Sequence, residues 1–256
     1  MNYYKNIFSV KNKTVFILGG SGLIGKETSN CLLEHGANIV NLDIKKNNKL
    51  KNNIFFDCSD SKNLKNNYLS IIKKFGTPKI LINCSYPKTS DWNKNTFSEL
   101  NEESFHKNLK SHLNSYILLS RITANIMKVK KIKGSIVLLG SIYGVLGQDL
   151  SIYKKTNIKE NIAYSVIKGG IVNFTKQMAS YYGNYQIRVN CICPGGVLDK
   201  VNKKNKNFIK NYTSKVPLKR LASNKEIATT ILFLSSEASS YVTGTTLMVD
   251  GGWSAI

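Results

Sequence analysis

The chain has 256 residues, 42% of them hydrophobic, which is enough to bury one sizeable core and excludes an intrinsically disordered protein. The net charge of +22 comes almost entirely from lysines, often beside asparagines, with Arg121, Arg188 and Arg220 as the only arginines, so we expect solvated basic faces without a nucleic-acid partner. The five cysteines are an odd number and include no C-x-x-C pair, which argues against a disulfide framework and a zinc site. No apolar run approaches the roughly 20 residues that a membrane span needs, and the first residues do not resemble a secretory signal. We therefore expect a cytoplasmic protein.

Short apolar segments alternate with helical patterns along the whole chain. The first, TVFIL, is apolar at nearly every position, which is typical of a parallel strand buried on both faces. Such strands are expected at 14–18, 37–43, 52–57, 79–83, 134–140, 187–192 and 245–250, and the clearest helices at 26–36, 102–128, 162–182 and 224–236. Because alternating strands and helices are joined by right-handed crossovers, we predict an α/β fold with one doubly wound, seven-stranded parallel sheet in a Rossmann-like three-layer α/β/α arrangement. No linker or repeat divides the chain, so residues 1–256 are expected to form a single domain.

The first strand is followed by GGSGLIG, in which Gly19, Gly22 and Gly25 recur at every third position. In such a turn the first glycine allows a sharp bend, the second lets the backbone approach a pyrophosphate, and the third lets the helix pack closely on the strand. The free N–H groups and the positive dipole end of the helix then face the phosphates. We therefore expect a dinucleotide to contact Gly19, Ser21, Gly22, Leu23, Ile24 and Gly25.

A carboxylate ends the second strand. Asp43 can accept hydrogen bonds from both ribose hydroxyls of an adenosine and would repel a 2′-phosphate, which favours NAD as the cofactor. Lys45 and Lys46 follow it and could attract that phosphate, so NADP remains the alternative. Asp57 is expected at the adenine edge, and the Asn83 amide is expected to tie neighbouring strands together. Further cofactor contacts are expected near strand ends, from Cys58, Cys84, Pro194, Gly195 and Val197.

The segment AYSVIKGG carries a tyrosine and a lysine four positions apart. On a helix, Tyr164 and Lys168 would share a face with about 6 Å between their Cβ atoms. A nearby ammonium would lower the tyrosine pKa from about 10, so that the phenol could exchange a proton with an alcohol or a ketone near neutral pH. The pair alone is also an ordinary helix pattern. Ser141 follows the fifth strand, where its hydroxyl could bond the reacting oxygen, and this favours a catalytic site.

Together these motifs resemble the short-chain dehydrogenase/reductase superfamily along essentially the whole chain. The resemblance is carried by GGSGLIG, GSIVLLGSIYG, AYSVIKGGI, IRVNCICPGGV, PLKRLASNKEIATTILFLSSEASSYVTG and VDGGW. It implies Tyr164 as the catalytic acid/base, Lys168 as its pKa-lowering and ribose-binding partner, and Ser141 as the residue that positions the substrate. It also implies a homotetramer or dimer. The chain is most similar to the members that modify sugars, surface glycans and flagellin.

Several positions depart from the family pattern. His112 takes the place of the relay asparagine, where an imidazole could bind the relay water and would add its own pH dependence; Asn108 and Asn114 are the alternatives. A longer segment at about 145–163 is expected to run over the substrate pocket, and residues at about 198–216 are expected to cover it. Candidate substrate contacts are Tyr86 and Trp92 in one loop and Gln148, Asp149, Tyr153, Lys154 and Lys155 in the longer segment.

The sequence therefore predicts an enzyme, an NAD(P)-dependent oxidoreductase that interconverts a secondary alcohol and a ketone on a sugar or sugar-phosphate type of small molecule. A 3-oxoacyl-acyl-carrier-protein reductase is the first alternative, because a basic face suits an acidic carrier protein, but the longer segment and Asp43 disfavour it. A non-catalytic dinucleotide-sensing or scaffold protein is the second. Loss of the tyrosine, the lysine or the serine would mark such a protein, and none is lost.

Overall fold

Seven parallel strands form one sheet in the computed structural model, which describes residues 3–45, 51–199 and 202–256. The sheet has the order β3-β2-β1-β4-β5-β6-β7, and every pair of neighbours is parallel. The predicted doubly wound sheet is therefore confirmed. The strands are β1 (Thr14–Leu18), β2 (Asn38–Asp43), β3 (Asn53–Phe55), β4 (Ile80–Asn83), β5 (Gly134–Leu139), β6 (Ile187–Pro194) and β7 (Thr246–Val249).

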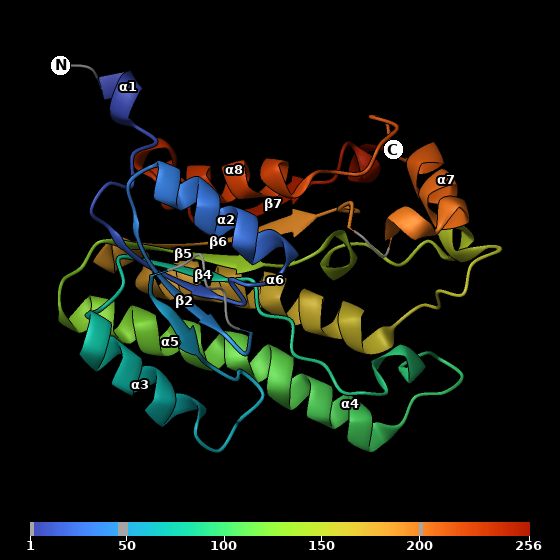
Figure 1. The fold of residues 1–256 in the computed structure, drawn as a ribbon, viewed down its shortest axis with the longest axis horizontal. Helices are drawn as coiled ribbons and strands as arrows, with labels where there is room; N and C mark the ends of the chain where they lie inside the picture. Colours follow the sequence, from blue (N-terminus) through green and yellow to red (C-terminus); the bar gives the residue numbers. More distant parts are fainter. Residues whose placement is uncertain (1–2, 46–50, 200–201) are drawn as a thin grey trace.

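Helices cover both faces of the sheet (Figure 1), which is why the central strands β1, β4 and β5 are largely apolar. Successive side chains of β1 point to opposite faces: Val15 and Ile17 belong to one hydrophobic cluster, and Phe16 and Leu18 belong to the other. The helices α2 (Leu23–Glu34) and α8 (Asn224–Ser235) pack on the first face. The second face carries α3 (Leu64–Phe75), α5 (Asn114–Val129) and α6 (Ile162–Tyr182).

The predicted helix at 102–128 is divided into three parts. It begins as α4 (Glu102–Asn108), continues through a π-helical turn η2 (Leu109–Leu113) and ends as α5. A π-helical turn inserts a residue into the helix and often marks a functional position. The remaining elements are α1 (Tyr3–Asn6), α7 (Lys206–Lys215) and the short helical turns η1 (Trp92–Lys94), η3 (Ile142–Gly144), η4 (Leu150–Tyr153), η5 (Gly183–Tyr185), η6 (Asn202–Lys204), η7 (Glu237–Ser239) and η8 (Trp253–Ala255).

The strand order places the candidate cofactor-binding and catalytic residues at one edge of the sheet. β1 lies between β2 and β4, so the chain reverses its direction of winding there, and in such sheets ligands bind beyond the carboxyl ends of the strands. The glycine turn after β1, the loop after β4 and Ser141 after β5 all lie at that edge.

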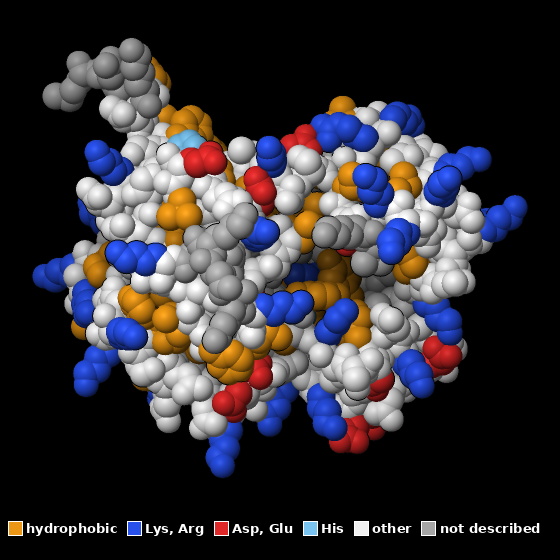
Figure 2. Space-filling view, in the orientation of Figure 1, with side chains coloured by type: hydrophobic (Ala, Val, Ile, Leu, Met, Phe, Trp, Pro, Cys, Tyr) orange, Lys and Arg blue, Asp and Glu red, His pale blue; other side chains and the backbone are white. Residues whose placement is uncertain are grey.

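The surface is basic without one dominant basic patch on the face drawn in Figure 2, where lysine and arginine side chains are spread over most elements. All five cysteines are free thiols. Within the described ranges, no helix has the length and apolar character to cross a bilayer, and no three His, Cys, Asp or Glu side chains are grouped to hold a metal ion.

Candidate active site

A cleft runs along the carboxyl ends of the strands and consists of two adjoining cavities of about 620 Å³ and about 440 Å³. The two share Gly22, Cys84, Ser85 and Tyr86 as walls. The larger cavity contains Tyr164 and Lys168 of α6, and the smaller one contains Asp43, which ends β2, and Asp57, which follows β3. An elongated ligand that occupies both would therefore join the two halves of the predicted site.

The glycine turn after β1 exposes its backbone to this cleft. Gly19 has φ +73°, and a Cβ atom there would lie 2.7 Å from Cα of Ser85, so only glycine fits. A Cβ atom at Gly22 would meet only the Gly19 carbonyl oxygen, at 3.2 Å, and Gly22 lines both cavities as the uncapped first position before α2. Exposed backbone at a helix N-terminus suits a pyrophosphate, so these residues fit a dinucleotide.

The predicted role of Gly25 requires correction. The expectation was that its missing side chain lets α2 pack on the strand. A Cβ atom there would instead collide with the Gly19 carbonyl oxygen and approach Cα of Gly20 at 2.7 Å. Gly25 therefore keeps the turn itself closed. Ser21 completes the turn, Leu23 and Ile24 begin α2, and both of these apolar residues line the larger cavity.

Hydrogen bonds to the backbone fix the carboxylate of Asp43 at the smaller cavity. Its Oδ2 accepts from the Ser21 N–H at 2.9 Å, and its Oδ1 accepts from the Lys45 N–H at 2.8 Å. The neighbouring Asp57 accepts from the N–H and the hydroxyl of Ser59, at 2.7 and 2.6 Å. Both carboxylates line this cavity, as the adenosine hypothesis requires. Lys46 lies outside the described residues.

Cys58 and Cys84, which were predicted to contact the cofactor, line the cleft as neutral thiols. Burial raises the pKa of Cys58 to about 12 and that of Cys84 to about 12. A thiol that keeps its proton is a poor nucleophile. We assign both residues to the walls of the site.

Asn83 does not tie neighbouring strands together, contrary to the prediction. Its Oδ1 accepts from the N–H and the hydroxyl of Ser85, at 3.1 and 2.7 Å, and its Nδ2 is buried without a hydrogen-bond partner among the described residues. The Tyr116 hydroxyl donates to the carbonyl oxygens of Asn83 and Ser85. These contacts shape the turn after β4, which carries Tyr86 into the cleft.

Tyr164 and Lys168 project into the larger cavity from the same side of α6. Lys168 Nζ lies 5.7 Å from the centroid of the Tyr164 ring and donates to the Leu139 carbonyl oxygen at 2.7 Å. Asn161 caps the helix by accepting from the Tyr164 N–H at 2.8 Å, which sets the start of α6 one turn before the pair. Leu139 ends β5, so the lysine is held by the strand that leads to Ser141.

Close packing of η3 on α6 places Ser141 beside Tyr164. A Cβ atom at Gly144 would lie 2.6 Å from the Lys168 carbonyl oxygen, so η3 can approach α6 only because this residue is glycine. The Ser141 side chain caps η3 and accepts from the Tyr143 N–H at 3.2 Å. A hydrogen bond from Ser141 also lowers the pKa of Tyr164.

Burial dominates the titration of the reactive pair. It raises the pKa of Tyr164 above the usual value despite the opposite effect of Ser141, and it lowers the pKa of Lys168 to about 8. The predicted lowering of the tyrosine pKa by the lysine is therefore wrong for the ligand-free protein. The reason is that loss of water disfavours the charged form of each group, and the lysine amine is directed at a backbone carbonyl.

His112 is fully buried in the π-helical turn, and neither ring nitrogen has a hydrogen-bond partner among the described residues. Its ring lies edge-on to Tyr86, with centroids 5.2 Å apart. Burial and the charge of Lys168 hold the pKa of His112 well below its usual value, so the imidazole is neutral at physiological pH. The predicted pH dependence from this residue is therefore wrong, although its position beside the reactive pair agrees with the sequence.

The longer segment lines the pocket through only part of its predicted residues. Gln148 and Tyr153 line the larger cavity, and the Gln148 Nε2 donates to the Asn161 carbonyl oxygen and to the Ser165 hydroxyl, both at 2.8 Å. Asp149 instead forms an ion pair with Lys215 of α7 at 2.6 Å. Lys154 and Lys155 are absent from the walls of this cavity, because their backbone carbonyls are bound by Asn211 and Asn207 of α7.

Aromatic rings form the opposite wall. Tyr86 and Trp92 meet edge-on at 5.6 Å between centroids, and each also lies edge-on to Tyr164, at 6.0 and 6.4 Å. On the far side, Pro194, Gly195 and Val197 follow β6 and line the same cavity. The structure thus brings the predicted residues of four separate chain segments to one cavity.

Several residues of the larger cavity were not predicted, among them Tyr143, Lys159 and Asn161. Asn161 could have been found, because an asparagine three positions before Tyr164 is a common helix N-cap. Nothing in the local sequence marks Tyr143 or Lys159. Their places depend on how the segment after β5 folds back over α6.

Comparison with known proteins agrees with this geometry. A family model described as enoyl-(acyl carrier protein) reductase matches residues 21–254. The post-translational flagellin modification protein A of Campylobacter coli is 31% identical over 257 residues, which are 95% of this chain and 99% of that protein. The 3-oxoacyl-[acyl-carrier-protein] reductase FabG of Buchnera aphidicola subsp. Schizaphis graminum is 31% identical over 253 residues, which are 95% of this chain and 98% of that protein.

A solved structure shows the same arrangement with a higher identity. The short chain dehydrogenase from Leptospira borgpetersenii serovar Hardjo-bovis, crystallised with bound NAD+, is 35% identical and superposes with a TM-score of 0.86. The superposition covers 99% of this chain and 96% of that chain. The chain therefore belongs to the short-chain dehydrogenase/reductase superfamily and is an oxidoreductase that acts on CH–OH groups.

Proposed function

We propose that the protein uses NAD to interconvert a secondary alcohol and a ketone on a sugar or sugar-phosphate type of substrate. One observation carries the proposal: Tyr164 and Lys168 line the same cavity as Gly22, the bare start of the phosphate-binding helix. The group that would transfer the proton, the Tyr164 phenol, therefore lies in the same cleft as the backbone that would bind the phosphates of a dinucleotide.

The residues that would hold the dinucleotide follow the strand ends. Gly22 and the first turn of α2 would bind the pyrophosphate, and Asp43 and Asp57 would face the adenosine. Pro194 and Gly195 would line the nicotinamide end. When bound, the cofactor would supply or accept the hydride. Asp43 supports NAD rather than NADP, because a fixed carboxylate repels a 2′-phosphate.

The chain's own residues would move the proton. The Ser141 hydroxyl would hold the substrate oxygen, and the Tyr164 phenol would give it a proton during reduction or take one during oxidation. Because burial keeps the phenol protonated in the ligand-free protein, Tyr164 is ready to act as an acid. To act as a base it needs added positive charge in the site, and the Lys168 ammonium would supply part of it.

We propose that His112 takes part as a neutral group in the proton relay, at the position where the family has an asparagine. Its two buried nitrogens lack partners among the described side chains, so a water molecule there would satisfy one of them and link the site of Lys168 to solvent. We also retain a homo-oligomer and a cytoplasmic location as parts of the proposal.

The walls of the larger cavity support a polyhydroxylated substrate. Gln148, Asn161 and Tyr153 offer polar groups, and the rings of Tyr86 and Trp92 could stack on a sugar face. The similarity to a flagellin modification protein supports the same class. The similarity to FabG keeps a 3-oxoacyl-acyl-carrier-protein substrate as the second candidate, and the lysine-rich surface favours it.

A substrate panel tests the proposal. Purified protein with NAD+ or NADP+ is mixed with sugars, sugar phosphates and nucleotide sugars, and reduced cofactor is followed by absorbance; the reverse direction uses a 3-oxoacyl thioester. The expected result is turnover of one sugar class with NAD+, abolished in Tyr164→Phe. Turnover confined to the thioester would replace the sugar hypothesis with the second candidate.

A further inference from the structure

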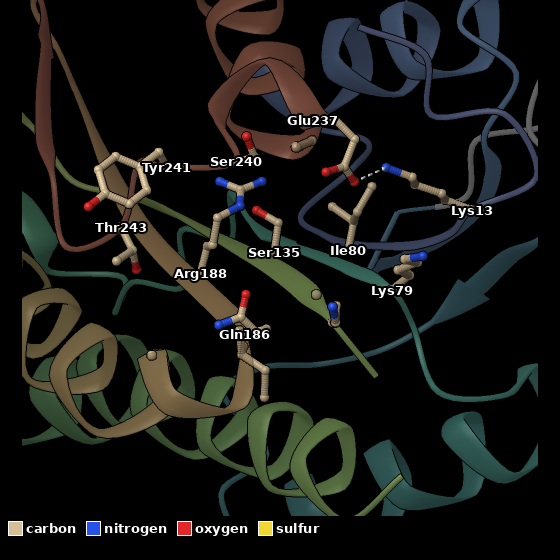
Figure 3. A pocket seen from close by; sticks show the side chains of 15 residues that line it. Lys13, Lys79, Ile80, Ser135, Gln186, Arg188, Glu237, Ser240, Tyr241 and Thr243 are labelled. Carbon is tan, nitrogen blue, oxygen red and sulfur yellow. Dashed lines mark hydrogen bonds and ion pairs between the residues drawn. The ribbon is translucent and has the colours of Figure 1, made fainter. Parts of the chain in front are cut away.

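A second cavity, of about 560 Å³, lies at the opposite edge of the sheet from the cleft. Its floor is built by the amino ends of the central strands, where Lys13 precedes β1, Lys79 precedes β4 and Lys133 precedes β5. The chain that follows α8 closes it from above (Figure 3). Its volume lies within the range of roughly 300–1,000 Å³ that is usual for small-molecule sites.

Positive charge is concentrated in this cavity. Lys13, Lys79, Lys133 and Arg188 line it, against one carboxylate, that of Glu237. Only Lys13 is paired with that carboxylate, at 3.2 Å; within the described part of the chain, Lys79 and Lys133 form no ion pair. Figure 3 shows the pair of Lys13 and Glu237 at one side, with the Arg188 guanidinium between Ser135 and Ser240.

Arg188 is held rigidly without being neutralised. Its guanidinium donates to the carbonyl oxygens of Val242, Leu234 and Ser236, at 3.2, 3.0 and 3.1 Å. These acceptors carry no net charge, and they use three of the five N–H donors that a guanidinium has. Burial lowers the pKa of Arg188, but arginine remains charged in proteins. The cavity therefore has a fixed planar cation whose remaining donors are available to an anion.

Neutral donors surround this cation. Gln186, Ser240 and Thr243 lie on the walls of the cavity, and Figure 3 shows Ser240 beside the Arg188 guanidinium. Ser235 also lines the cavity; the residue is 2% exposed, and its hydroxyl has no hydrogen-bond partner among the described residues. A buried hydroxyl without a partner is costly unless a ligand or water satisfies it.

We propose that this cavity binds a small anion with two linked phosphate groups, at a site separate from the cofactor cleft. A guanidinium fork with two flanking ammonium groups matches phosphate oxygens, and a diphosphate spans separated cations that a single phosphate cannot reach together. The cavity is concave and enclosed by backbone from several elements, which suits a small ligand better than an extended nucleic acid. The negative Glu237 at its side limits the affinity.

Isothermal titration of the full chain with inorganic pyrophosphate tests the proposal, at constant ionic strength and with or without saturating NAD+. Because the glycine turn of the cofactor cleft can also bind pyrophosphate, the decisive titration is the one with saturating NAD+, in which we expect one equivalent to bind at the second cavity. The variant Lys79→Ala/Lys133→Ala should bind about tenfold more weakly or worse, since two charge-assisted contacts are removed. Glu237→Gln should bind several-fold more tightly. Neither variant should change turnover.

The matched control is Lys206→Ala/Lys210→Ala on the exposed side of α7, which removes the same net charge at the carboxyl end of the sheet, opposite the cavity (Figure 1). Equal loss of affinity in the control would overturn the proposal, because the effect would then be one of overall charge. No detectable binding in the presence of saturating NAD+, or tighter binding of a short DNA duplex through the same lysines, would also overturn it.

Discussion

The carboxylate of Asp43 offers the sharpest test of how the site selects its cofactor. Its two oxygens accept from the backbone N–H groups of Ser21 and Lys45 at 2.9 and 2.8 Å, so its position at the smaller cavity does not depend on a ligand. Asp43→Asn keeps the size of the side chain and one acceptor, and it removes the charge. The amide NH2 also replaces one of the two acceptors, so the melting temperature of the variant is compared with that of the wild type before a change in cofactor preference is assigned to the lost charge.

The expected magnitude follows from charge and partial burial. Two unit charges about 4 Å apart repel by about 1 kcal/mol in water and by about 4 kcal/mol at the effective dielectric constant near a protein surface. A 2′-phosphate carries about 1.5–2 negative charges at pH 7. Because Asp43 is half-buried, we expect Asp43→Asn to remove about 2 kcal/mol of repulsion, a gain of about 30-fold in kcat/KM with NADP. Loss of charged hydrogen bonds to the ribose should cost NAD about tenfold.

The assay compares kcat/KM for both cofactors at one concentration of a substrate found in the panel. Asp57→Asn is the matched control, because it lies in the same cavity and has its carboxylate bound by Ser59. The control should leave the ratio of the two cofactors within a few-fold of the wild type. A wild-type protein that already prefers NADP, or an unchanged ratio in Asp43→Asn, would refute the reasoning.

Three further predictions concern α6. Tyr164→Phe should lower single-turnover rates by about 10²–10⁴-fold with unchanged NAD affinity by fluorescence titration, since only the phenol oxygen is lost; a normal rate would remove the proposed acid. Lys168→Met should be inactive yet more stable at pH 7, by about 1–2 kcal/mol in urea unfolding, because the buried amine with its pKa of about 8 no longer has to be charged. The unfolding free energy of the wild type should approach that of this variant as the pH rises from about 8 to about 10, because the unfolded lysine keeps its proton longer; a constant difference would contradict the lowered pKa. Asn161→Ala should cost about 2 kcal/mol, since it removes a helix cap and the 2.7 Å hydrogen bond to the Trp92 carbonyl oxygen, whereas Asn205→Ala removes only a cap and should cost about 1 kcal/mol. Equal losses in the two asparagine variants would show that the Trp92 contact adds nothing.

Much of the fold could be read from local pattern. The seven segments predicted as strands are the seven strands of the sheet. A strand that is covered on both faces forms a short continuous apolar run, which is easy to recognise in the sequence, and TVFIL is such a run. The glycine turn and the spacing of Tyr164 and Lys168 are local as well, since a turn and one helical turn are set by a few consecutive residues. Helix limits were less exact: α2 begins at Leu23 rather than Lys26, because the glycine turn leads directly into it.

The sequence alone therefore determined the strand–helix alternation, the glycine turn and the shared face of the reactive pair, because each depends on neighbours within a few positions. Tertiary structure alone decided the rest. Burial reversed the expected pKa shift of Tyr164, a π-helical turn enclosed the neutral His112, and α7 drew Asp149 away from the pocket. The physical reason is that desolvation and long-range contacts sum over segments far apart in the chain, which no local pattern records.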